Sequence, residues 1–250
     1  MSTLTSYTSG TRPSASANSG LCIFRSDTNA IEVSDGTDWQ TYNSDGVYLD
    51  YSSGNTHSGD FDGNDYAVGT VGDLNSVSAF STSCWFRYQG TLGGSTHIPL
   101  SGAGTWYVWV KSTTNIEYAT QNNPKTFTIP TINDSTWYHL VTVHDGTNAT
   151  LYLDGSSLGT QTVSSVPSTA GNAFNIGRFT SASYYWNGWI DEVSVFNRAL
   201  TSTEVTNIYS NKTYLNPTAI WRLNNDTTDE LGTYDLTNNT ITFDGTNKAY

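Results

Sequence analysis

Residues 137–160 read WYHLVTVHDGTNATLYLDGSSLGT, and residues 174–200 read FNIGRFTSASYYWNGWIDEVSVFNRAL. In the first stretch, apolar residues alternate with polar ones along 141–144 and again along 151–154. A period of two predicts strands with one face on a core, and the Asp-Gly pair at 145–146 predicts a hairpin between them. The second stretch adds a run of β-branched and aromatic residues that predicts another strand. Together these stretches predict an all-β fold.

The order of these residues resembles the laminin-G-like members of the concanavalin A-like lectin/glucanase superfamily. The resemblance implies an antiparallel jelly-roll β-sandwich. It implies little about function, because this sandwich is found in lectins, enzymes, adhesion modules and inert spacers alike. The pieces that carry it are Trp137-Tyr138-His139, Tyr152-Leu153-Asp154-Gly155, Asn175-Ile176-Gly177 and Gly188-Trp189-Ile190-Asp191-Glu192-Val193 through Leu200.

Composition limits the classes of partner. The chain has 250 residues, which is enough for one sizeable β domain with appendages. Its 22 acidic residues outnumber its 10 basic residues, and the resulting net charge of −12 repels phosphate backbones. We therefore expect no nucleic-acid ligand, whereas neutral glycans and divalent cations remain compatible with this surface.

Processing and membrane signals are not expected from the sequence. Met1 is followed by neither a basic start nor an apolar run, which predicts no secretory signal. No apolar run approaches the length of a membrane span, so no membrane insertion is expected. Cys22 and Cys84 are too few for a disulfide framework, and Cys84, in a strand-like stretch, is expected to be free and buried.

Residues 1–45 are predicted to form an N-terminal arm and a small β-meander. Residues 1–20 are rich in Ser, Thr and Gly, and three short extended runs follow at 21–25, 30–33 and 39–42. A meander of this size buries too little surface to fold alone in water. It must therefore dock on the main domain, on copies of itself or on a larger assembly.

The same region resembles a module of bacteriophage structural proteins. The resemblance rests on Gly10-Thr11-Arg12-Pro13 and on Thr28-Asn29-Ala30-Ile31-Glu32-Val33 followed by Asp35-Gly36-Thr37-Asp38-Trp39. It implies a place on the virion surface, on capsid or tail, with other virion proteins bound through the arm. It also implies a homo-oligomer, for which a trimer is expected. The alternative is an ordinary polar hairpin without this ancestry.

Residues 46–250 are predicted to form the sandwich and one short helix. Thr201 and Glu204 have capping-box spacing and start that helix. The following residues 219–232 look like the segment that normally opens such a domain, and Thr242-Phe243-Asp244-Gly245 echoes Asp60-Phe61-Asp62-Gly63. Either the sandwich is circularly permuted and residues 217–250 complete it, or a second repeat is cut short. We favour permutation, because an unpaired fragment would expose a sheet edge.

The resemblance also implies a structural calcium ion. Its ligands would be Asp191, Asp226 and Asp229, since calcium takes oxygen ligands from carboxylates and carbonyls in loops rich in Asp and Gly. The alternative is that Asp226 and Asp229 form turns, with Asp191 solvated or hydrogen-bonded on its strand.

No catalytic residues are predicted. Glucanases with this fold place carboxylates on one strand in an E-x-D-x-x-E type array, so that two of them flank one glycosidic bond. Asp191 and Glu192 are adjacent and should point to opposite faces of a strand. The chain is therefore expected not to be an enzyme. None of its glutamates has that spacing: Glu32, Glu117, Glu192, Glu204 and Glu230.

Aromatic residues in or beside the predicted loops are candidates for glycan binding. They are Trp106, Trp109, Tyr184, Tyr185 and Trp186. The alternative for each is packing in the core. Together, the two resemblances imply a non-enzymatic virion protein, a capsid decoration or a tail or fibre appendage. Its sandwich would serve adhesion or bind a cell-surface glycan. The alternative is a polysaccharide-active enzyme or its carbohydrate-binding module.

Overall fold

A computed structural model describes residues 6–8, 10–17, 22–25, 30–34, 37, 39–43, 46–50, 54–92, 97–134, 136–180 and 184–249. Its contacts divide the chain into two compact units. One comprises Asn55–Val205 and Pro217–Tyr250, and the other comprises Met1–Gly54 and Thr206–Asn216. The unit boundary expected at residues 45 and 46 is wrong, because the strand at Gly46–Asp50 pairs within the N-terminal unit.

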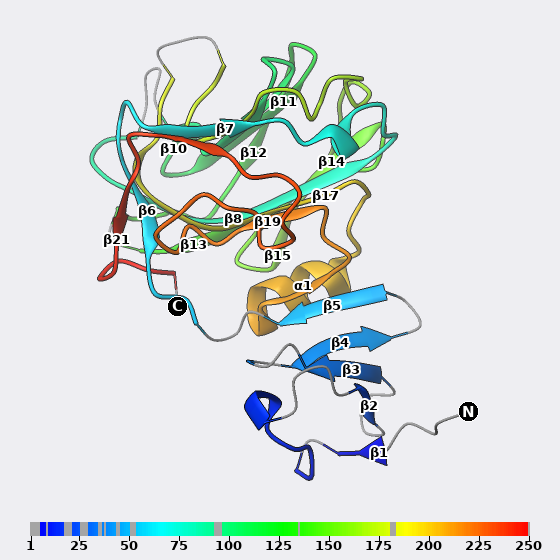
Figure 1. The fold of residues 1–250 in the computed structure, drawn as a ribbon. Helices are drawn as coiled ribbons and strands as arrows, with labels where there is room; N and C mark the ends of the chain where they lie inside the picture. Colours follow the sequence, from blue (N-terminus) through cyan, green and yellow to red (C-terminus); the bar gives the residue numbers. More distant parts are fainter. Residues whose placement is uncertain are drawn as a thin grey trace. The chain divides into compact units, whose positions relative to one another are not determined.

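The larger unit is a sandwich of two antiparallel sheets, which confirms the predicted concanavalin A-like jelly roll (Figure 1). Among the described residues, one sheet has eight strands: β6 (Ser58–Asp62), β8 (Phe80–Tyr88), β13 (Tyr138–His144), β14 (Asn148–Leu153), β15 (Ser156–Thr162), β17 (Asn187–Phe196), β19 (Ala219–Trp221) and β21 (Thr242–Asp244). The other has seven: β7 (Tyr66–Gly69), β9 (Leu100–Gly102), β10 (Trp106–Ser112), β11 (Asn115–Thr120), β12 (Asn123–Thr128), β16 (Phe174–Ile176) and β20 (Thr237–Asn239).

The β13–β14 hairpin forms as the alternation predicts. Leu140 lies opposite Leu153, and His144 lies opposite Ala149. In the turn, the Asp145 carboxylate accepts hydrogen bonds from the backbone N–H groups of Thr147 (3.0 Å) and Asn148 (2.8 Å). A short polar side chain that satisfies the turn in this way explains why this segment reverses direction here.

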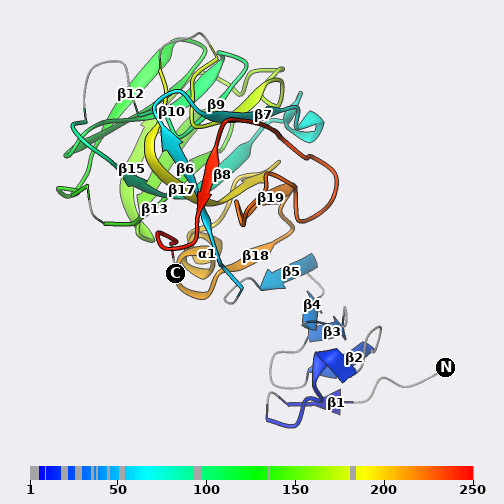
Figure 2. The same cartoon turned by 60° about the vertical axis from the view of Figure 1, so that its left-hand side comes forward.

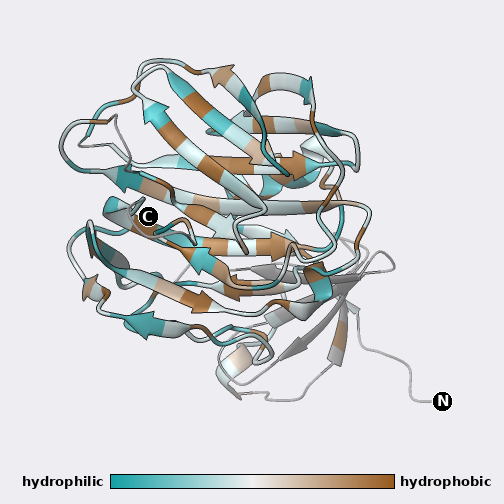
Figure 3. Cartoon of the chain, turned by 90° about the horizontal axis from the view of Figure 1, so that it is seen from above, coloured by the Kyte–Doolittle hydropathy of each residue, from teal (hydrophilic) through white to brown (hydrophobic). Residues whose placement is uncertain are grey.

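The core fills the space between the two sheets. Figure 3 shows apolar residues alternating with polar ones along many of the strands. Phe174 of β16 and Trp221 of β19 come from different sheets, and their rings stack with centroids 5.1 Å apart. Cys84 is fully buried and free, as predicted, and burial raises the pKa of its thiol. The largest fully buried aromatic side chains of this unit are Trp106, Trp186, Trp221, Tyr118, Phe61, Phe80, Phe86, Phe127, Phe174 and Phe196.

The C-terminal segment supplies strands to both sheets of the sandwich. β19 pairs with β17, β20 pairs with β7, and β21 pairs with β6. Figures 1 and 2 both show the red end of the chain lying beside the cyan β6. The two similar F-D-G segments are therefore neighbours, with Thr242 opposite Asp60 and Phe243 opposite Gly59. This is the arrangement that a permuted sandwich requires, and it covers edges that would otherwise be bare.

The N-terminal unit is built on a six-stranded sheet in the order β1-β2-β3-β4-β5-β18. β2, β3 and β4 form the predicted meander, although the connections at 26–29, 35–36 and 38 lie outside the described residues. The strands are β1 (Ser6–Tyr7), β2 (Cys22–Arg25), β3 (Ala30–Ser34), β4 (Trp39–Asn43), β5 (Gly46–Asp50) and β18 (Thr213–Leu215).

Trp39 is the centre of a small core in this unit. It is buried with Ala15 and Ile23, and its indole Nε1 donates a hydrogen bond to the carbonyl of Pro13 (3.0 Å). The Arg12 guanidinium carbon lies 5.9 Å from the centre of a Trp39 ring. The G-x-R-P segment and the tryptophan of the hairpin therefore pack against each other, although 26 positions separate Pro13 from Trp39.

Helical segments are few among the described residues: η1 (Ala15–Ala17), η2 (Gly72–Leu74) and α1 (Ser202–Asn211). The predicted capping box starts α1: the Thr201 N–H donates to the Glu204 carboxylate (2.7 Å), and the Glu204 N–H donates to the Thr201 hydroxyl (3.3 Å). In the described part of the chain, no helix is both long enough and apolar enough to span a bilayer.

We predict that Trp221→Ala strongly destabilises the sandwich. The side chain is fully buried, stacks on Phe174 and donates a hydrogen bond to the Tyr234 carbonyl (2.8 Å). Its truncation should lower the free energy of unfolding by about 3–5 kcal/mol, measured by denaturant titration. Leu231→Ala is the matched control, because this exposed residue of the same segment should contribute about 0.5 kcal/mol or less. Equal stability of the two variants would contradict a structural role for the segment.

Candidate functional site

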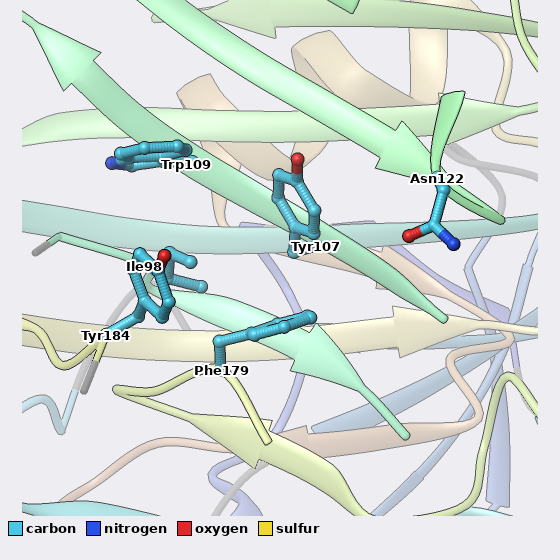
Figure 4. Close-up of a pocket in the computed structure, with 6 residues that line it drawn as sticks. All are labelled: Ile98, Tyr107, Trp109, Asn122, Phe179 and Tyr184. Carbon is cyan, nitrogen blue, oxygen red and sulfur yellow. The ribbon is translucent and has the colours of Figure 1, made fainter. Parts of the chain in front are cut away.

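A pocket of about 250 Å³ opens on the outer side of the seven-stranded sheet. It lies entirely within the sandwich unit. Its described lining residues are Ile98, Tyr107, Trp109, Asn122, Phe179 and Tyr184 (Figure 4).

Strand β10 forms one wall of this pocket because its side chains alternate. Trp106, Val108 and Val110 point into the core and are fully buried, whereas Tyr107 and Trp109 lie on the opposite face and are half-buried. A strand that covers the core with one face must present its other residues on the outer side. The two outer aromatic residues are thus fixed in place by the packing of the inner ones.

The segment after β16 forms the opposite wall. Figure 4 shows Phe179 and Tyr184 facing Tyr107 and Trp109 across the pocket. The Phe179 N–H donates a hydrogen bond to the Tyr184 carbonyl (2.9 Å), which joins the two described parts of this segment. The Ser101 hydroxyl of β9 donates to the Arg178 carbonyl (2.8 Å) and ties the segment to the sheet.

The glycine of the N-I-G motif allows this segment to leave β16. Gly177 has φ +86°, and a Cβ at this position would lie 2.4 Å from the Phe61 ring. Both the backbone conformation and the close contact require glycine. The motif therefore determines where Phe179 and Tyr184 are placed.

The four aromatic rings stand edge to face. The ring centroids of Tyr107 and Phe179 are 5.3 Å apart with an interplanar angle of 81°. Trp109 and Tyr184 are 6.1 Å apart at 70°, and Phe179 and Tyr184 are 6.2 Å apart at 85°. Such contacts between ring edges and faces are favourable and hold each ring in one orientation. The result is a preformed aromatic pocket in place of a flat platform.

A buried carboxylate lies beside Tyr107 on the same face of the sheet. Glu117 of β11 is opposite Trp109 in the ladder and is 6% exposed. The Tyr107 hydroxyl donates to one of its oxygens (2.8 Å), and Lys111 Nζ donates to the other (2.6 Å). Burial, and then the Glu117 carboxylate, raise the pKa of Tyr107, so this hydroxyl keeps its proton at neutral pH.

Asn122 supplies a polar group at one end of the pocket. It lies in the turn between β11 and β12, where Gln121 (φ +48°) and Asn122 (φ +60°) both have left-handed backbone conformations. Two such residues form the tight type of turn that joins antiparallel strands, and asparagine tolerates it well. The exposed carboxamide can both donate and accept hydrogen bonds.

The structure brings two of the five predicted glycan-binding residues, Trp109 and Tyr184, to this pocket. Tyr185 is half-buried and lies against Tyr66, with ring centroids 6.3 Å apart, and it is not among the lining residues. Trp106 and Trp186 are fully buried, so their selection as ligand-binding residues is wrong. Trp106 donates its indole N–H to the Ala170 carbonyl (2.8 Å), and Trp186 packs edge-on against Phe86.

Tyr107 and Phe179 line the pocket but are not among the predicted residues. Tyr107 could have been found, because the two-residue alternation that sends Trp106 inward sends Tyr107 and Trp109 outward. Phe179 carries no comparable signal. It reaches the pocket only through the fold of the segment that follows Gly177.

The three predicted calcium ligands do not form one site. The Asp229 carboxylate accepts four backbone hydrogen bonds, from Ile220, Leu231, Thr233 and Tyr234, at 2.9–3.2 Å. These donors occupy the lone-pair positions that a metal ion would need. Asp226 is exposed and accepts hydrogen bonds from the backbone and hydroxyl of Thr228, as a turn-forming residue does.

Asp191 is fully buried and has its own set of donors. It accepts hydrogen bonds from Asn55 Nδ2, from the Ala249 N–H and from the Glu192 N–H, each at 2.9 Å. Burial, and then the neighbouring Glu192 charge, raise its pKa well above the usual range. Among the described residues, no group of three His, Cys, Asp or Glu side chains is placed to hold a metal ion. These carboxylates do not fit the calcium site that the resemblance implies.

Glu192, the neighbour of Asp191 on β17, is also fully buried. The ladder between β17 and β8 shifts between Asp191 and Ser194, and Glu192 has φ +48°. Such a β-bulge turns one residue out of the regular alternation. The Glu192 carboxylate accepts a hydrogen bond from Arg222 Nε (2.8 Å), so this carboxylate belongs to a buried ion pair.

A sequence profile described as the Concanavalin A-like lectin/glucanases superfamily matches residues 61–206. The chain belongs to this superfamily. Residues 217–250, which complete the two sheets, lie outside the matched region.

Two solved structures illustrate the similarity of fold. A candidate carbohydrate-binding protein from Bacteroides ovatus matches with a TM-score of 0.58 and 17% identity, over 75% of this chain and 59% of that protein. This chain therefore spans less than two thirds of that protein. A heptameric SAP-like pentraxin from Limulus polyphemus matches with a TM-score of 0.52 and 20% identity, over 62% of this chain and 82% of that one. No curated protein matches the sequence.

Thermal melts in calcium and in chelator test whether these three aspartates hold a metal ion. Because the three aspartates are satisfied by other donors, we expect equal melting temperatures in calcium and in chelator. Asp191→Ala should lower the melting temperature equally in both, since three donors lose their buried acceptor at a cost of about 2 kcal/mol. Asp226→Ala is the control and should change little. A rise in melting temperature with calcium that Asp191→Ala abolishes would show that the metal site exists.

Proposed function

We propose that this chain is a lectin-like, non-catalytic module that binds carbohydrate in the aromatic pocket. The observation that carries the proposal is the group of four rings, Tyr107, Trp109, Phe179 and Tyr184, around a preformed hollow. Aromatic faces pack against the C–H groups of sugar rings, and a nearby amide or hydroxyl can hydrogen-bond sugar hydroxyls. Asn122 and Tyr107 supply such groups.

The size and position of the pocket agree with this proposal. Ligand pockets for drug-sized molecules have volumes of roughly 300–1,000 Å³. A hollow of about 250 Å³ therefore suits one sugar ring of a longer glycan whose remainder stays in solvent. The name of the Bacteroides ovatus protein with the similar fold also supports carbohydrate as the ligand class.

The arrangement of carboxylates favours binding over hydrolysis. Glycosidases flank the scissile bond with two carboxyl groups, roughly 5–10 Å apart. The described lining of this pocket contains no carboxylate, and the adjacent Glu117 is held by Tyr107 and Lys111. The ion pair of Glu192 with Arg222 is buried. A module that accompanies a polysaccharide-active enzyme remains the alternative within this proposal.

We further propose that the N-terminal unit attaches the module to a bacteriophage particle, as a capsid decoration or a tail or fibre appendage. The contact between the G-x-R-P segment and Trp39 supports it, because both parts of the phage-like motif meet in one small core. A core of this size is marginal in water, which favours self-association or attachment to other virion proteins. The expected assembly is a trimer.

The binding proposal predicts that Trp109→Ala weakens glycan binding. A glycan array identifies a ligand, and titration with that ligand then measures the loss. Removal of one stacking ring should reduce affinity on the order of tenfold. Tyr152→Ala, which removes a half-buried aromatic residue from the other sheet, is the control and should leave affinity unchanged. Equal affinity of wild type and Trp109→Ala would show that the pocket is not the binding site.

The attachment proposal predicts that Trp39→Ala lowers the oligomeric mass and leaves glycan binding intact. Loss of the tryptophan removes the centre of the small core and its hydrogen bond to Pro13. Light scattering of the full chain should report a trimer for wild type and for the Trp109→Ala control, and a smaller species for Trp39→Ala. A monomeric wild type, or an unchanged mass in the variant, would count against assembly through this unit.

A further inference from the structure

The hydrogen bonds beside the pocket determine whether the Tyr107 hydroxyl donates to a ligand or accepts from it. Glu117 Oε1 accepts from the Tyr107 hydroxyl at 2.8 Å, and Glu117 Oε2 accepts from Lys111 Nζ at 2.6 Å. An ionised carboxylate can only accept, and a lysine ammonium group can only donate. The single proton of Tyr107 is therefore directed to Glu117. Toward a ligand, the phenolic oxygen can then only accept hydrogen bonds.

The distribution of charge around the pocket also disfavours an anionic ligand. None of the six described lining residues is charged. Lys111 lies on the outer face of β10, 5.0 Å from the centre of a Trp109 ring, but it forms an ion pair with Glu117. No lining cation is thus on hand to neutralise an anionic ligand, and the chain as a whole carries a net charge of −12. A carboxylate in this pocket would lose hydration, and the cation beside it, Lys111, is already paired with Glu117.

Resting on the proposed function, we infer that the pocket selects neutral sugars that donate hydroxyl hydrogen bonds to Tyr107, and that it discriminates against sugars bearing a carboxylate. Glu117 is the residue that sets this selectivity. It acts through Tyr107 and is a positioning residue.

A single substitution reverses the direction of the hydrogen bond between residue 117 and Tyr107. In Glu117→Gln, the carboxamide oxygen must face Lys111, because an amide N–H₂ group and an ammonium group cannot hydrogen-bond each other. The amide nitrogen then faces Tyr107 and donates to its oxygen. The Tyr107 proton is released from the protein side and becomes available to an acceptor on the ligand.

The test uses a glycan array that presents neutral oligosaccharides and their sialylated counterparts. Wild type should bind neutral members in a Trp109-dependent manner and bind the sialylated counterparts at least about tenfold more weakly. Glu117→Gln should lower the ratio of neutral to sialylated affinity by about tenfold. Glu230→Gln removes the same charge outside the pocket and should leave the ratio unchanged.

Tyr107→Phe provides a second variant that does not depend on the stability of Glu117→Gln. It removes the acceptor, so it should lower the affinity for neutral glycans about tenfold without raising the affinity for sialylated ones. The inference is overturned if wild type binds both classes equally through Trp109, or if neither Glu117→Gln nor Tyr107→Phe changes the ratio. The proposed function would survive those results. Absence of any Trp109-dependent glycan binding would overturn both.

Discussion

The stacking of Phe174 on Trp221 joins the two sheets of the sandwich, and much of the structure depends on it. Phe174 precedes the segment that carries Phe179 and Tyr184, whereas Trp221 lies in the C-terminal segment. The same Phe174 ring also contacts Trp106 at the start of β10, with centroids 5.8 Å apart. One cluster of buried rings thus supports both walls of the pocket. Packing of this density allows little adjustment, which is why the site is preformed.

The pocket illustrates how a sandwich separates stability from recognition. Each residue of β10 serves one purpose according to its parity: Trp106, Val108 and Val110 fill the core, while Tyr107 and Trp109 are available on the outer side. Substitution on the outer face therefore changes the chemistry of the site at small cost to the core. This property explains why a single fold can serve proteins of very different function.

Much of the fold was predictable from sequence because short-range patterns determined it. The alternation along β13 and β14, the capping box of α1 and the opening-strand pattern around Trp221 all led to elements that the structure contains. The site was less predictable. Trp106 and Trp109 have the same chemistry in the sequence, and only strand parity separates them. The placement of Phe179 depends on long-range packing around Gly177, and no local sequence pattern predicts the β-bulge at Glu192.

The hydrogen bonds of Asp191 bring the two ends of the sandwich unit together. One of its oxygens accepts hydrogen bonds from both Asn55 and Ala249, which are near the two ends of the sandwich unit. The entry and exit of this domain are therefore neighbours in space. A short linker could join these two ends, and the chain could then begin just before β19. The order of the strands along the chain would change, but each strand would keep its neighbours in the sheets. Evolution can reorder such a domain by duplication and trimming, because the fold depends on which strands are adjacent more than on where the chain is cut.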